Sequence, residues 1–149
     1  MVIWQSIHYI QEKILVLVVM LADWAWTDRA SADKTQAAKR AREAERLLRE
    51  CLAVRLKTLP DTSHRKADTR SCLGGALVVV AATDTSLTAA ARLAKLTEAE
   101  PLLLKGQQIP DAVPTQQRDA CVRLVRLYEA WDELAPNTGK AAQAAVWRR

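Results

Sequence analysis

The sequence predicts an all-α protein, built as an α-solenoid of antiparallel helix pairs. Ala, Leu, Arg and Glu are abundant, whereas the 149 residues include four Gly, five Pro and no Phe, a composition that favours helix throughout. The one β-branched run, Val78–Val80, lies inside a longer helical pattern. The motif Glu-Ala-Glu-x-Leu-Leu occurs twice, beginning at Glu43 and at Glu98. A repeated helix that cannot bury its apolar stripe alone is expected to stack on its neighbours.

Proline, glycine and short polar stretches divide the chain into segments whose apolar residues are spaced three and four apart, the pattern of a helix with one buried face. Pro60 ends the second helix, and Pro110 and Pro114 keep a later segment irregular. Thr97 and Glu100 have the spacing of a capping box, so a new helix is predicted to begin at Thr97. About six main helices and a short inserted one follow: Trp4–Asp28, Lys34–Leu59, His64–Ala82, the inserted Leu87–Leu96, then Thr97–Gly106, Thr115–Trp131 and Lys140–Arg149.

The most apolar stretch, Ile14–Ala22, contains no charged residue. A membrane span needs about 20 such residues, so no span is predicted, and bulky Trp24 and Trp26 follow in place of the small residues of a signal-peptide cleavage site. We therefore expect a helix buried over most of its circumference, with Trp4, Trp24 and Trp26 as packing residues. An exposed apolar helix that docks on another segment or chain is the alternative, which makes residues 1–28 a candidate oligomerisation surface.

The formal net charge of +5 raises the question of nucleic acid, because clustered Lys and Arg release counterions from phosphate. Along the second helix, however, basic residues alternate with glutamates. Pairs such as Glu45 with Arg49 and Arg46 with Glu50 fall four residues apart, which is the spacing of a solvated helix face. We interpret the charge as solvated surface, and a basic nucleic-acid-binding helical protein remains the less favoured alternative.

No arrangement of residues points to catalysis or to a metal. Cys51, Cys72 and Cys121 are an odd number at wide spacings, so neither a disulfide framework nor a zinc site is indicated, and we expect buried, reduced thiols in a cytoplasmic protein. The best local candidate for chemistry, Asp61-Thr62-Ser63-His64, already serves as the cap of the third helix. His8 is interpreted as a packing residue. We predict no enzyme activity, cofactor, bound metal or small-molecule substrate.

The chain resembles a tetratricopeptide repeat protein of the kinesin light chain-like type. The residues that carry the resemblance are Glu43–Leu52, Arg70–Leu77 and Glu98–Gly106. In that family the first helix of a unit carries Leu, a small residue and a second large residue, and the second helix carries Ala with a large apolar residue four positions on. The matching structural positions are Leu73, Gly74 and Leu77, Ala44 with Leu48, Ala99 with Leu103, and Leu124 with Tyr128 in a terminal unit.

These segments also resemble the C-terminal tetratricopeptide segment of large serine/threonine protein kinases of planctomycete-like bacteria. No kinase motif occurs in the chain, so it would be a detached module. The resemblance implies one domain, residues 1–149, that forms a right-handed solenoid. The family repeat is roughly 34 residues, whereas the two copies of the motif, at Glu43 and Glu98, begin 55 residues apart. The longer distance implies an insertion. The implied units are a degenerate first one at about 4–59, a second at about 64–107 with the insertion near 84–96, and a C-terminal unit or cap at about 115–149.

The resemblance implies a non-catalytic scaffold that binds a peptide or partner domain on the concave face formed by successive first helices. Trp131 and Trp147 are expected to close the end of the core, as terminal repeats do. The positions that match solvent-facing residues of the concave face are Asp68, Ser71 and Gly75 in the second unit and Asp119, Arg126 and Glu129 in the last.

Overall fold

The computed structural model describes residues 2–30, 33–108 and 113–149. In these ranges it contains helices and turns but no strand, so the all-α prediction is confirmed. The side chains of Trp4 and His8 lie outside the described part, and their predicted packing therefore stays a prediction. The helices are α1 (Val2–Thr27), the 3₁₀ turn η1 (Asp28–Ala30), α2 (Lys34–Thr58), α3 (His64–Thr83), α4 (Ala89–Gln107), α5 (Pro114–Leu134) and α6 (Lys140–Trp147).

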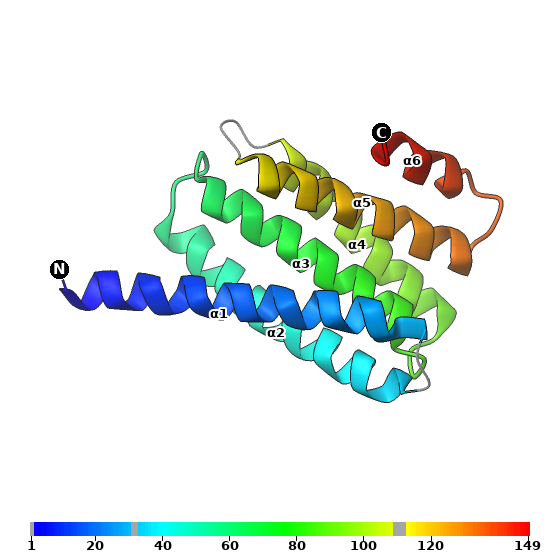
Figure 1. The fold of residues 1–149 in the computed structure, drawn as a ribbon, viewed down its shortest axis with the longest axis horizontal. Helices are drawn as coiled ribbons and strands as arrows, with labels where there is room; N and C mark the ends of the chain where they lie inside the picture. The colour runs from blue at the N-terminus through cyan, green and yellow to red at the C-terminus, as the bar shows by residue number, and fades with distance from the viewer. Residues whose placement is uncertain (1, 31–32, 109–112) are drawn as a thin grey trace.

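Each helix packs against the next along the chain, and α3 also contacts α1 and α5. Figure 1 shows α3 between α1 and α5, with α2 and α4 behind these three helices and α6 folded back along α5. Short connections place consecutive helices beside one another. The result is a helical domain in which α3 is the central element.

The core of the domain is centred on α3, in which 13 of 20 residues are buried. Small residues let its neighbours approach closely: a Cβ added to Gly74 would lie 2.7 Å from Cγ of Leu103, and one added to Gly106 of α4 would lie 2.6 Å from Cβ of Ser71. Only glycine permits these approaches without a shift. All nine predicted structural positions are buried: Ala44, Leu48, Leu73, Gly74, Leu77, Ala99, Leu103, Leu124 and Tyr128.

The region expected to hold an inserted helix and a new helix is one continuous helix, α4, so the predicted boundary at Thr97 is wrong. The helix is capped at Thr88, whose Oγ1 accepts a hydrogen bond from the backbone N–H of Ala91 at 3.1 Å. Thr97 instead donates its hydroxyl to the carbonyl of Leu93 at 3.0 Å, as a residue inside a helix does. The insertion near residues 84–96 is therefore a turn and the first part of a longer helix.

Pro101 lies within α4, where it cannot donate the hydrogen bond that a helix interior expects. The helix continues because one face of it is fully buried against the core. Leu96, Ala99 and Leu103 are each inaccessible to solvent. Burial of a leucine side chain contributes about 1.5 to 3 kcal/mol, so Leu96 and Leu103 together offset the roughly 3 kcal/mol cost of a proline in a helix interior.

The C-terminal end of the core agrees with expectation. Trp131 and Trp147 are partly buried and pack against the core cluster. The ammonium nitrogen of Lys140 lies 3.9 Å from the centre of the Trp131 ring, a cation–π contact that fixes the start of α6 on α5. The turn before α6 contains Gly139 with φ +80°, a left-handed conformation that favours glycine.

Candidate interaction surface

Helix α1 is anchored to the domain by one side only, so the prediction that it is buried over most of its circumference is wrong. Leu15, Val18, Ala22 and Ala25 are buried and are spaced three or four residues apart, which makes one stripe along the helix. This stripe packs on α2 and α3. Trp26 is buried beside it, whereas Trp24, which was also expected to pack inside, is exposed.

Ion pairs hold the polar positions of α1 against the domain. The carboxylate of Glu12 accepts a hydrogen bond from Nη2 of Arg55 at 2.7 Å, and the buried Arg55 also donates to Oγ1 of Thr69 at 2.7 Å. Farther along, Asp23 accepts from Nη1 of Arg126 at 2.6 Å. The two acidic residues of α1 are thus bound to arginines of its own chain.

The opposite side of α1 is an exposed apolar surface, here named the α1 outer face. Among the residues that the structure describes, 13 large apolar side chains are exposed, and eight of these lie on α1. Their exposed fractions run from 46% to 77%. The α1 outer face consists of Val2, Ile3, Tyr9, Ile14, Val16, Leu17, Met20 and Trp24.

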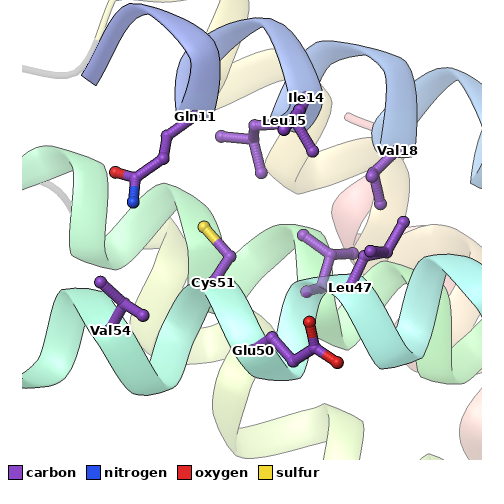
Figure 2. Close-up of a pocket in the computed structure, with 9 residues that line it drawn as sticks. Gln11, Ile14, Leu15, Val18, Leu47, Glu50, Cys51 and Val54 are labelled. Atoms are coloured by element: carbon purple, nitrogen blue, oxygen red, sulfur yellow. The ribbon is translucent and has the colours of Figure 1, made fainter. Parts of the chain in front are cut away.

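A groove of about 230 Å³ lies between α1 and α2 and continues from the outer face through Ile14. Figure 2 shows Leu15 and Val18 of α1 directed toward Cys51 and Leu47 of α2 across this space. Its lining is predominantly apolar. The α1–α2 groove is lined by Gln11, Ile14, Leu15 and Val18 of α1 and by Leu47, Leu48, Glu50, Cys51 and Val54 of α2.

The polar groups of the α1–α2 groove do not assemble into a reactive site. Glu50 accepts a hydrogen bond from Nη1 of Arg46 at 2.7 Å. Burial raises the pKa of the Cys51 thiol, so the group is protonated at neutral pH and is a poor nucleophile. Among the described residues no group of His, Cys, Asp and Glu is placed to hold a metal ion. The groove is suited to apolar contact.

The predicted partner-binding positions on α3 do not form an open surface. Ser71 is 1% exposed and accepts a hydrogen bond from Nη1 of Arg123 at 3.0 Å, so its predicted solvent-facing position is wrong. The Arg123 side chain also occupies the space beside Gly75, where a Cβ would meet its Cδ at 2.9 Å. Asp68 is partly buried, and this burial raises the pKa of its carboxyl. The Arg123 side chain of α5 therefore fills the predicted concave face.

The predicted positions on α5 are divided between intramolecular pairs and solvent. Asp119 is exposed. Arg126 is bound to Asp23, and its guanidinium lies 5.2 Å from the centre of the Trp26 ring. Glu129 accepts a hydrogen bond from Arg148.

The structure brings Gly75 and Arg126 together in one crevice between α1, α3 and α5, with a volume of only about 10 Å³. A space of that size holds about one water molecule. The predicted residues therefore do not share a site for a peptide.

Positive charge gathers in a second cleft of about 590 Å³, which lies between α5, α6 and the end of α1. Its lining includes Arg118, Arg126, Arg148 and Arg149 together with Trp26 and Trp147. Arg126 and Arg148 are already paired with carboxylates. Part of the positive charge is therefore neutralised within the chain.

Within the described residues, no helix has both the length and the hydropathy needed to cross a bilayer. Comparison with known proteins finds no match: no family model, no curated protein and no solved structure is significantly similar to this chain.

Proposed function

We propose that the chain is a non-catalytic helical interaction module that binds an apolar helix in the α1–α2 groove and along the adjoining α1 outer face. The observation that carries this proposal is the exposed apolar surface, which continues from Leu17 through Ile14 into the groove and ends at Val54 on α2. Extended apolar patches on a protein surface mark interaction sites. An amphipathic helix lying in an apolar groove is a recurring mode of recognition.

The spacing of residues on both walls favours a helix as the occupant. On α1 the residues Ile14, Leu17 and Trp24 fall on one exposed side at intervals of three and seven. On α2, Leu47 and Val54 line the groove seven residues apart, with Cys51 between them. Rows of side chains that repeat every three or four residues accept the ridges of a third helix.

The tetratricopeptide-like solenoid is a further part of the proposal. It is supported by the packing of each helix on the next and by the contacts that link α3 to both α1 and α5. It is also supported by the burial of Ala44 with Leu48 and of Ala99 with Leu103, the pairs that carry the resemblance. A detached module of a bacterial serine/threonine kinase is one origin for such a chain. In this proposal the binding surface is the α1–α2 groove rather than the filled space beside Ser71.

Photo-crosslinking tests the position of the binding surface. A benzophenone amino acid replaces Leu17 or Val54 in the full chain expressed in cells, and replacement of Val146 is the matched control because Val146 is 65% exposed on α6, away from the groove. We expect covalent adducts from positions 17 and 54, whether to another protein or to a second copy, and not from position 146. Equal yields at all three positions, or no adduct at 17 and 54, would contradict the proposal.

A further inference from the structure

We infer that the helix occupying the α1–α2 groove is α1 of a second copy of this chain, so that α1 and α2 of two copies form a two-fold four-helix arrangement. This inference rests on the proposed function, because it names the occupant of the same groove. In a two-fold pairing the same surface of each copy contacts the other, so it must be complementary to itself. Helix α1 meets this requirement, since it is one wall of the groove and is itself an exposed apolar helix.

The spacing along α1 suits pairing with an identical helix. Ile14, Leu17, Leu21 and Trp24 follow at intervals of three, four and three residues, which is the heptad spacing of helices that pack side by side. Ile14, Leu17 and Trp24 are exposed, and Leu21 is partly exposed. Ile14 and Leu17 are therefore available for contact, whereas one face of the Trp24 ring is covered by the guanidinium of Arg40.

The charges of α1 leave most of its outer face apolar. Glu12 and Asp23 are bound to Arg55 and Arg126 of the same chain, and the ammonium of Lys13 lies 5.4 Å from the centre of the Tyr9 ring. Two cations adjoin the α1 outer face: the exposed Lys13, four residues from both Tyr9 and Leu17, and Arg40, whose guanidinium lies 3.9 Å from the centre of the Trp24 ring. The acidic groups of α1 are thus already paired, and the rest of the α1 outer face is an apolar surface of the kind that a second apolar helix would cover.

The length of the exposed surface is that of a long helix–helix contact. A standard interface buries about 800 Å² on each partner. The 26 residues of α1 extend about 39 Å at 1.5 Å per residue. Eight large apolar side chains of α1 are exposed along this length, and Val54 of α2 is exposed in the adjoining groove. A second copy lying along α1 would cover these side chains together.

The shape of the domain favours an antiparallel pair. Figure 1 shows the N-terminal turns of α1 extending beyond the ends of α2 and α3. The side chains of Val2 and Ile3, on these turns, are more than three-quarters exposed. In an antiparallel pair the projecting turns of one copy lie along the body of the other, and the opposed helix dipoles are favourable. A parallel pair would leave both projections without a supporting domain.

Sedimentation velocity of the purified full chain tests the inference. We expect the wild-type chain to dimerise with rising concentration and Leu17→Glu to sediment as a monomer, because a charge would be buried in the seam. The matched control Val146→Glu is expected to dimerise like the wild type, and circular dichroism checks that both variants are folded. A wild-type chain that stays monomeric at about 100 µM, a concentration at which any interface with a micromolar Kd is largely formed, would overturn the inference.

The two proposals fail in distinguishable ways. A monomeric wild-type chain that still gives adducts to other proteins from positions 17 and 54 overturns the homotypic pairing and leaves the interaction module standing. Absence of both dimer and adducts overturns both. Co-flotation with phosphatidylcholine–phosphatidylglycerol vesicles, lost in Leu17→Glu, would assign the α1 outer face to a lipid surface and overturn the pairing.

Cysteine cross-linking tests the antiparallel orientation. Ile3→Cys and Trp24→Cys are introduced into separate chains in which Cys51 and Cys121, the two partly exposed native thiols, are replaced by alanine. Treatment with a short bismaleimide is expected to join the Ile3→Cys chain to the Trp24→Cys chain. Efficient joining of two Ile3→Cys chains, with none between the different chains, would show a parallel pair and contradict the arrangement.

Discussion

Helices α1 and α3 are both rich in apolar residues, yet they lie in opposite environments. Most of α3 is buried among four neighbouring helices, whereas one side of α1 packs and the other is exposed. The difference lies in the elements that pack against each helix. Gly74 and Gly75 let helices approach α3 closely, while Leu17 and Met20 project from α1 into solvent and Trp24 contacts only the guanidinium of Arg40 on its exposed side. Apolar content alone therefore does not locate the core.

The largest expected effect is the difference in unfolding free energy between a substitution in the core around α3 and one on the exposed side of α1. Leu103→Ala removes a fully buried side chain that packs on α3 and is expected to lower the free energy of unfolding by about 2 to 5 kcal/mol. Leu17→Ala, on the α1 outer face, is expected to change it by less than about 0.5 kcal/mol at protein concentrations too low for association. Urea denaturation measures both values, and similar losses at the two sites would contradict the contrast.

A smaller effect is expected where α4 approaches α3. An alanine at Gly106 would place its Cβ 2.6 Å from Cβ and 3.1 Å from Cα of Ser71, so the two helices would have to separate. We expect Gly106→Ala to destabilise the fold by about 1 to 3 kcal/mol. At an unobstructed site inside a helix the same change stabilises by up to about 1 kcal/mol. A gain in thermal stability would therefore show that the close approach is absent.

The C-terminal cap of α3 gives the fold a pH dependence. Burial alone would raise the pKa of Asp84, but hydrogen bonds from Ser86 and Arg42 outweigh it and hold the pKa below its usual value of 3.8. Because the pKa is lower in the folded state, the stabilisation is fully present above the unfolded pKa and is lost as pH falls through the folded pKa. We expect Asp84→Asn to be less stable at neutral pH.

In urea denaturation at a series of pH values, Asp84→Asn should lose less stability than the wild type when the pH is lowered below 3.8, the usual pKa of this group. Asp119→Asn, at an exposed site on α5, is the matched control and should follow the wild-type curve. If the wild type and Asp84→Asn lose the same stability as the pH is lowered, the proposed role of Asp84 is contradicted.

A small effect is expected at Arg126, which joins α5 to Asp23 of α1 at a partly exposed position. An ion pair of this kind contributes about 0.2 to 1 kcal/mol, so Arg126→Gln should weaken the fold only slightly. It should also leave the yield of adducts from position 17 unchanged, because Arg126 lies outside the α1–α2 groove. A large loss of adducts would instead place the binding site on the face between α3 and α5, as the sequence predicted.

Much of the fold was predictable from local signals in the sequence. The starts of α2, α3 and α6 at Lys34, His64 and Lys140 agree with prediction because polar stretches, Pro60 and Gly139 mark the preceding turns. The start at Thr97 failed because its capping-box spacing and Pro101 resemble a helix beginning. The tertiary packing of α4 overrode those local signals. Short-range sequence patterns do not report tertiary packing.

The candidate site was less predictable. Ser71 was assigned to an open face by resemblance, and its burial depends on Arg123, 52 residues away in the sequence. The groove residues of α2, such as Val54, were not singled out, since their neighbours Arg46 and Glu50 form a solvated face. A signal for α1 was present, because Ile14–Ala22 is apolar on every side. The sequence alone did not decide whether its own chain or another would cover that helix.

The most direct test of the central claim, that two copies meet through the α1 outer face, is the urea midpoint of the wild-type chain measured between about 1 and about 100 µM protein, since association shifts apparent stability by mass action. If a second copy covers α1, the midpoint rises with protein concentration, and the rise disappears in Leu17→Glu. A midpoint that is independent of concentration in the wild type, or a rise that persists in Leu17→Glu, would contradict the claim that two copies meet through this face.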